Sequence, residues 1–353
     1  MRTIQEHLQK CVEEKIFPGA VYQYGTSEGI LGHGAVGTLG IGRGPVNEST
    51  LYDLASVTKP LAALAFMKLL EEGLACLDDP IDYYLPDYAG HAKGNNTMFQ
   101  LLTHTSGIPG QVQLYRTCHT KREMLDGILY LPPRDNVHQP VMYSSQGLIV
   151  IGEIISAITG KPLDRAMREL VFEPLGMADT MFNPPESRFA NTASTEDCPW
   201  RGKVVVGQVH DENAVVMGGV GGHAGIFSTA ADVAKVGRAM LTGLDAAGGQ
   251  YLRRATIRLM TKNHTAHLNL ARGLGWMCRD AHDSRAGDLV SEHSLGHSGF
   301  TGTSIWVDPE RDLYAVLLTN RVHPTREGGG IARARHIFHN LAVYHWEDVD
   351  SGT

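Results

Sequence analysis

The chain has 353 residues, of which 42% are hydrophobic and 20% are charged, and its formal net charge is −7. This is an ordinary globular composition, long enough for one large domain or two smaller ones. The acidic balance gives no support to nucleic-acid binding, and no apolar run is long enough to cross a bilayer.

The N-terminal segment, MRTIQEHLQKCVEEKIFPGA, predicts an amphipathic helix rather than a signal peptide. Ile4, Leu8, Val12 and Ile16 lie on one stripe with charged residues between them. We therefore expect a cytoplasmic protein, unless a leader has been removed.

The cysteines predict reduced thiols. The five of them are an odd number, are widely spread and include no C-x-x-C pair. This pattern argues against a disulfide framework and against a thiolate zinc site. We expect neither a metal nor a cofactor.

The remaining elements fall into three blocks. Two short strands, 20–24 and 29–37, follow the first helix, and residues 56–241 are mainly helical. The last third returns to strands and ends in a helix. The helices predicted inside the block cover 100–107, 121–131, 146–159 and 229–241. The later elements are strands at 273–278, 297–303 (running on to 307) and 313–319, a hairpin loop at 308–312, and a helix at 330–346.

Since strands that are consecutive in the chain usually neighbour one another in a sheet, this order predicts an α+β fold, an α/β sandwich. Both chain ends join one antiparallel sheet flanked by the N- and C-terminal helices, and the helical block is an insertion. Residues 1–55 plus 242–353 then form the sheet domain and residues 56–241 the helical domain. We expect the active site in the cleft between them.

Ser56 and Lys59 lie three positions apart at the start of the apolar run that ends at Gly73. Residues three apart share a helix face, so the hydroxyl and the amine can meet in the first turn. A free serine needs a base beside it to be a useful nucleophile. A helix N-terminus, where the field is positive, favours the neutral amine that such a base requires. Alone, the spacing also fits a capping serine and a solvated lysine.

Two further motifs fall where the cleft is expected. Tyr143-Ser144-Ser145 precedes the apolar helix at 146–159, and His297-Ser298-Gly299 opens a strand in the last third. A phenol near Lys59 can relay a proton to a leaving group. A glycine-flanked strand edge lets a substrate approach the backbone, whose N–H groups can bind an oxyanion.

With these motifs the sequence resembles the serine β-lactamase-like hydrolases, which include class C β-lactamases, DD-peptidases and family VIII carboxylesterases. The resemblance covers about residues 19–320 and is carried by LASVTKP at Leu54, LLTHTSGI at Leu101 and GHSGFTGT at Gly296. It implies the β-lactamase/transpeptidase-like fold. It also implies that Ser56 is the nucleophile, Lys59 its base and Tyr143 the group that shuttles the proton.

The resemblance assigns substrate-binding roles to further positions. Ser145 matches the third position of a Tyr-x-Asn motif, and His297, Ser298 and Gly299 match a Lys-Thr-Gly strand. The oxyanion would be bound by the backbone N–H groups of Ser56 and Phe300.

Two departures from the family pattern bear on the substrate. Ser145 offers no amide to hold a substrate carbonyl, and His297 replaces a fixed positive charge with a weaker one near neutral pH. Both favour a carboxylesterase acting on small acyl esters through an acyl-enzyme. The alternative is an amide hydrolase of a D-amino-acid peptide, a muropeptide or a β-lactam. A non-catalytic binding module is a remote third hypothesis. The partner is a small-molecule ester or amide, and the oligomeric state stays open.

A polar segment, VHDENA, brings His210, Asp211 and Asn213 close in sequence to His223. These residue types could suggest a metal site, but their spacing matches no known zinc motif. We interpret them as a hydrogen-bonded loop on the rim of the cleft.

Overall fold

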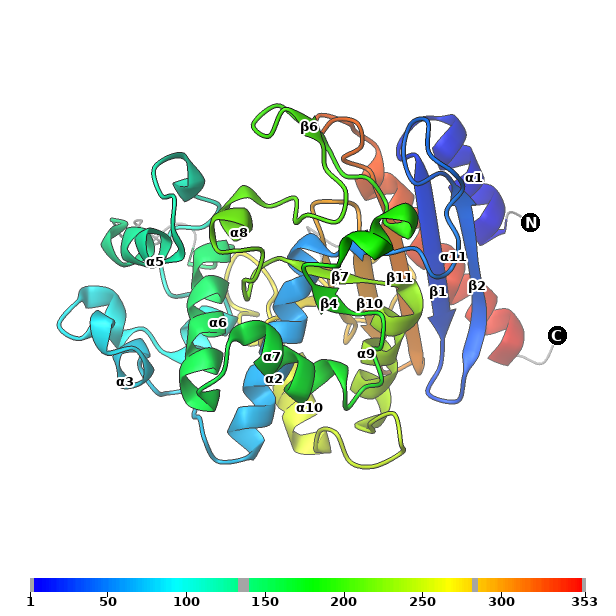
Figure 1. The fold of residues 1–353 in the computed structure, drawn as a ribbon. Helices are drawn as coiled ribbons and strands as arrows, with labels where there is room; N and C mark the ends of the chain where they lie inside the picture. Colours follow the sequence, from blue (N-terminus) through cyan, green and yellow to red (C-terminus); the bar gives the residue numbers. More distant parts are fainter. Residues whose placement is uncertain (1–2, 133–139, 281–284, 351–353) are drawn as a thin grey trace.

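One antiparallel sheet brings the two ends of the chain together, as the sequence predicts (Figure 1). The computed structural model describes residues 3–132, 140–280 and 285–350. Over that part of the chain, the strand order is β2-β1-β11-β10-β9-β8, so the first and last strands of the sequence pair directly. The strands are β1 Gly19–Gly25, β2 Ile30–Gly37, β8 Met277–Cys278, β9 Leu295–Ser298, β10 Ser304–Asp308 and β11 Leu313–Thr319.

Helices cover both faces of this sheet because alternate side chains of a strand point to opposite sides. In β11, Leu317 belongs to a cluster with the two terminal helices, α1 (Ile4–Glu13) and α11 (Ile331–Asp350). The adjacent Val316 belongs to a second, larger cluster on the other face, where α9 (Ala230–Thr242) packs. The sheet is therefore buried between two helical layers (Figure 1).

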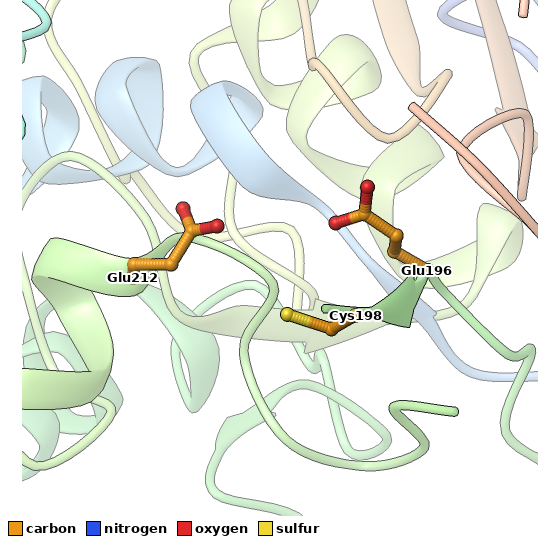
Figure 2. Close-up of side chains that lie close together, drawn as sticks. All are labelled: Glu196, Cys198 and Glu212. Atoms are coloured by element: carbon orange, nitrogen blue, oxygen red, sulfur yellow. The ribbon is translucent and has the colours of Figure 1, made fainter. Parts of the chain in front are cut away.

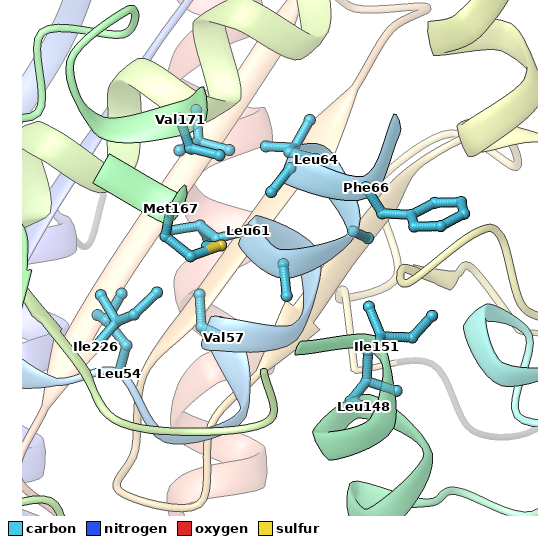
Figure 3. Packing of buried hydrophobic residues seen from close by; sticks show 14 of the residues in the cluster. Leu54, Val57, Leu61, Leu64, Phe66, Leu148, Ile151, Met167, Val171 and Ile226 are labelled. Atoms are coloured by element: carbon cyan, nitrogen blue, oxygen red, sulfur yellow. The ribbon is translucent and has the colours of Figure 1, made fainter. Parts of the chain in front are cut away.

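The second part of the molecule is built around α2 (Thr58–Glu71), which is buried on almost every side. Figure 3 shows Leu61 and Phe66 of this helix packed among side chains that include Leu148 of α6 (Ser145–Thr159). The other α-helices are α3 Ile81–Tyr84, α4 Met98–Leu102, α5 Lys121–Tyr130, α7 Leu163–Met167, α8 Glu212–Val216 and α10 Arg254–Thr261. The 3₁₀ turns are η1 Ala55–Val57, η2 Pro86–Tyr88, η3 Ala92–Asn95, η4 Leu114–Arg116 and η6 Glu186–Asn191, and η5 Arg168–Phe172 is a π-helical turn. Small strands form two minor sheets, β3 Tyr52–Asp53 with β7 Ile226–Ser228 and β4 Met181–Phe182, and β5 Asp197–Cys198 with β6 Lys203–Val204.

Three predicted elements end earlier or start later than expected, each at a left-handed residue. The helix predicted to end at Gly107 stops at Leu102, because His104 has a φ of +59°. The strand predicted over 273–278 is reduced to β8, since Gly275 has a φ of +75° and turns the chain tightly against α2. The strand predicted to run from His297 through Thr303 is interrupted after Ser298 by a turn containing Gly302, whose φ is +113°.

The α+β class and the sheet flanked by terminal helices are thus confirmed. The division of the chain into domains at residues 55/56 and 241/242 stays a prediction.

Candidate active site

Ser56 stands on a strained turn between β3 and α2. It lies in η1, and the preceding Ala55 has a φ of +47°, which is unfavourable for a residue with a Cβ. The buried carboxylate of Asp53 stabilises this conformation, because its Oδ1 accepts the Ala55 N–H at 2.8 Å. Burial raises the pKa of the Asp53 carboxyl. The turn projects Ser56 from the buried end of α2 into the cleft.

Lys59 lies one turn further along and is almost fully buried. Its Nζ is 2.9 Å from the Ser56 Oγ and 3.2 Å from the backbone oxygen of His223. The same nitrogen lies over the ring of Tyr143, 4.8 Å from its centroid. The structure therefore brings together the three side chains to which the resemblance gives catalytic roles, Ser56, Lys59 and Tyr143.

Tyr143 is positioned by the segment that opens α6. Ser144 caps this helix by accepting the Gly147 N–H at 3.0 Å, and its own N–H donates to Nδ1 of His104 at 3.1 Å. The His104 ring packs against Tyr143 at 4.9 Å between centroids. Burial and the nearby cation of Arg272 lower the pKa of His104 well below its usual range, so this imidazole is neutral.

Ser145 is the first residue of α6 and is buried.

The turn between β9 and β10 is tied to the backbone that precedes the nucleophile. The Thr301 hydroxyl donates to the carbonyl oxygen of Asp53 at 2.7 Å, and the Thr303 hydroxyl donates to that of Leu54 at 2.8 Å. Gly299 lies so close to this segment that a Cβ there would be 2.5 Å from the Leu54 oxygen. These contacts fix the turn relative to Ser56.

Phe300 lies at the tip of that turn and is 48% exposed. The ring stacks on His210 at 5.7 Å between centroids, and Arg321 lies over it at 4.3 Å. Over the described part of the chain, no acceptor takes the Phe300 N–H. This amide is thus available to a ligand, which an oxyanion-binding role requires.

His297 is buried in β9 and lines the cleft beside Tyr143, with 6.0 Å between the ring centroids. Its Nδ1 is 3.0 Å from the Ser298 oxygen, which can only accept, so Nδ1 carries the proton. Burial, followed by the charges of Lys59 and Arg272, lowers the pKa of His297 well below its usual range. The imidazole is neutral and cannot replace the lysine of the family pattern as a cation.

Arginines that the sequence reasoning missed supply positive charge instead. Ser56, Tyr143 and the His297–Phe300 segment line a cleft of about 890 Å³ that extends to the start of α11. Its described walls hold five arginines and one aspartate, Asp288. The arginines are Arg272, Arg285, Arg321, Arg333 and Arg335. Asp288 is itself paired with His336 at 2.8 Å, and the described walls therefore hold more basic than acidic side chains.

The polar segment at 210–213 forms hydrogen bonds with the elements around the site. His210 donates its N–H to Asp53 at 2.6 Å, and Asp211 accepts from His223 at 3.0 Å. Burial alone would raise the pKa of the Asp211 carboxyl, but His223 outweighs burial and holds it below its usual range. Asn213 bonds the backbone of Tyr115 at 2.9 Å. Through these bonds the segment supports Asp53 and the carbonyl that accepts from Lys59.

A nearby group of possible metal ligands is Glu196, Cys198 and Glu212, whose ligand atoms lie within 4.8 Å of one another (Figure 2). Arg326 donates to Glu196 and to Glu212, at 2.5 Å in each case. His210 also contacts the Glu196 carboxylate, at 3.1 Å. Because this arginine is bound to both carboxylates, the group fits an ion-pair network better than a metal centre.

The fold and this cleft are those of a serine hydrolase built on the penicillin-binding-protein and β-lactamase architecture. The sequence profile of the family described as Beta-lactamase matches residues 4–339. The chain belongs to the Beta-lactamase family.

Similar proteins include one from Escherichia coli (strain K12) named "Putative D-alanyl-D-alanine carboxypeptidase". It is 34% identical over 306 residues, which are 78% of this chain and 70% of that protein. Among solved structures, EstCE1, a hydrolase with promiscuous acyltransferase activity, has a TM-score of 0.79 at 21% identity. The match covers 96% of this chain and 97% of the EstCE1 chain. A penicillin-binding protein homologue from Caulobacter crescentus has a TM-score of 0.76 at 20% identity, over 97% and 96% of the two chains. These structural likenesses establish the fold.

No helix in the described ranges is both long and apolar enough to span a membrane.

Proposed function

We propose that the protein is an acyl-enzyme hydrolase in which Ser56 attacks the substrate carbonyl. Lys59 Nζ, 2.9 Å from the Ser56 Oγ, accepts the hydroxyl proton as the new C–O bond forms. The N–H groups of Ser56 and Phe300 bind the developing oxyanion. Tyr143, which lies against Lys59, passes the proton to the leaving group. Water then attacks the acyl-enzyme, with the same pair taking its proton and returning it to Ser56.

We further propose that the substrate is an amide that carries a carboxylate near the scissile bond, as a peptide with a free C-terminus does. The observation that carries this proposal is the arginine-rich wall of the cleft. Arg272 lies against the Tyr143 ring at 5.8 Å, and the guanidinium of Arg285 is 3.4 Å from the Ser298 Oγ. Guanidinium groups match carboxylates in charge and geometry. The name of the E. coli relative points to the same substrate class.

This proposal reverses the order of preference that the sequence suggested. The absence of a lysine at position 297 favoured esters because a histidine carries less positive charge near neutral pH. His297 is neutral, but Arg272 and Arg285 place two cations beside the same strand. The carboxylate-binding charge is therefore supplied from other segments.

The test compares Ser56→Ala, Arg272→Met and the unaltered protein on two substrates. These are an acyl-D-alanyl-D-alanine peptide and the same peptide with an amidated C-terminus. Ser56→Ala should abolish turnover, and Arg272→Met should raise KM for the free acid at least about tenfold while leaving the amidated peptide unaffected. Full turnover by Ser56→Ala would disprove the nucleophile assignment. Equal kinetics on both peptides would disprove carboxylate recognition.

A carboxylesterase is the second candidate. The buried Ser145 provides no side-chain amide for a peptide substrate, and the fold neighbour EstCE1 is a hydrolase with acyltransferase activity. Faster Ser56-dependent turnover of p-nitrophenyl butyrate than of either peptide would make this candidate the leading one.

A further inference from the structure

Arg335 reaches from α11 into the turn that carries Phe300. One nitrogen of its guanidinium, Nη2, donates to the carbonyl oxygen of Gly299 at 2.5 Å and to that of Thr303 at 2.9 Å. The side chain is only 7% exposed. It therefore ties the two ends of the turn to α11 through their carbonyl groups.

The charge of Arg335 has no carboxylate partner among the described residues. The charged groups that act on it are two more cations, Arg285 and Arg321, and burial with their repulsion lowers its pKa to about 9. A buried ion without a counter-ion is costly, so a structural role alone would be served better by a neutral donor. Instead of a carboxylate, the cation is bound to the carbonyl groups of Gly299 and Thr303 and polarises them.

The Gly299 carbonyl and the Phe300 N–H belong to one peptide unit. In a trans peptide the two groups point in opposite directions, and they are coupled by resonance across the C–N bond. A cation that donates to the carbonyl increases this resonance and makes the N–H a stronger donor. It also fixes the peptide plane and, with it, the direction of the N–H.

We propose that Arg335 is a positioning residue for the oxyanion hole, acting through the Gly299–Phe300 peptide. This inference rests on the proposed function, in which the Phe300 N–H binds the oxyanion. The Phe300 carbonyl is held by a second arginine, since Arg321 Nε donates to it at 2.7 Å. Both peptide units of the oxyanion residue are therefore restrained by cations.

The test uses Arg335→Met, which keeps much of the side-chain volume, and Arg335→Lys, which keeps the charge. Turnover of p-nitrophenyl butyrate should show kcat lowered about tenfold to a hundredfold in Arg335→Met, with KM within about twofold. This loss is below that for removal of an oxyanion donor outright. Arg335→Lys should recover part of kcat. Inhibition by phenylboronic acid, which forms a tetrahedral adduct on the serine, should weaken by the same factor as kcat.

Arg43 offers a matched control. It too donates to two backbone carbonyls, those of Thr192 at 2.6 Å and Phe189 at 2.7 Å, but it does not line the cleft. Arg43→Met should lower stability without changing kcat or boronate inhibition. If Arg335→Met retains kcat within about twofold, or loses kcat with unchanged boronate inhibition, the positioning role is wrong. Ser56→Ala separates the two proposals, since its full activity would overturn the proposed function itself. If Arg335→Met does not fold, Arg335→Gln, which keeps a donor but removes the charge, takes its place, and unaltered kcat and boronate inhibition in that variant would refute the role.

Discussion

Replacing Gly299 by alanine should misplace the oxyanion turn without removing any functional group. The new Cβ would lie 2.5 Å from the Leu54 carbonyl oxygen and 2.1 Å from the Thr303 hydroxyl oxygen. The hydroxyl can rotate, but the carbonyl is part of the backbone that leads into Ser56. The Cβ is about 0.9 Å nearer than the 3.4 Å at which such contacts become ordinary, so the turn must move away by nearly that distance.

A displacement of about 1 Å in a reacting arrangement can cost about a hundredfold in rate. We therefore expect Gly299→Ala to lower kcat about a hundredfold on p-nitrophenyl butyrate, with KM nearly unchanged. Overpacking should also lower the free energy of unfolding by about 1–3 kcal/mol, measured by urea denaturation. Gly29→Ala is the control, because a Cβ there meets nothing within 4 Å. A Gly299→Ala enzyme with kcat within about twofold of the original would show that the turn is not fixed by this contact.

Three further substitutions test other buried contacts of the structure. Thr303→Val leaves the Leu54 carbonyl without its hydroxyl donor and should cost about 1–3 kcal/mol in urea unfolding; no change would mean that the bond is dispensable. Asp211→Asn weakens the pair with His223, whose backbone carbonyl accepts a hydrogen bond from Lys59. We expect kcat to fall, and an unaltered kcat would show that this pair does not support Lys59. Burial lowers the pKa of the His339 imidazole to about 3 in the folded protein. Between about pH 6.5 and 3 this imidazole is therefore protonated only in the unfolded chain, so the free energy of unfolding falls as the pH drops through that range. His339→Leu should make that decline shallower by about 1.4 kcal/mol per pH unit, and parallel curves would contradict the assignment.

Local sequence patterns were enough to predict the main architecture. The stripe of α1 is a signal of period 3.6, and α6 and β11 are apolar runs of helical and strand length; such signals depend only on neighbours in the chain. The end of α4 at Leu102 was missed because it depends on a left-handed His104, which is not a residue that usually ends a helix. The shortening of β8 was missed because it follows from packing of Gly275 against Ala63, a contact between distant segments.

The difference between local patterns and contacts of distant segments also decides which site residues could be predicted. Ser56 and Lys59 are three positions apart, so their spacing predicted that the hydroxyl and the amine can meet, and together with the later motifs it favoured the contact that the structure has at 2.9 Å. The arginines of the cleft come from four separate segments and follow no local pattern. Arg335 could have been found only as a charged residue on the buried face of the terminal helix, which is an unusual position for an arginine.

The charge of the cleft is opposite to that of the whole molecule, and this contrast bears on the substrate. The chain carries a formal net charge of −7, yet the described walls beside Ser56 hold five arginines. At physiological ionic strength charges are screened over about 8 Å, so a bound substrate experiences the arginines rather than the distant acidic surface. Positive charge lining a cleft attracts anionic ligands and raises their local concentration. A neutral ester would gain nothing from this arrangement, whereas an acyl substrate with its own carboxylate would gain both affinity and orientation. The positive charge of the described cleft walls thus favours the free-acid peptide over the simple ester, even though both can be opened by the same serine.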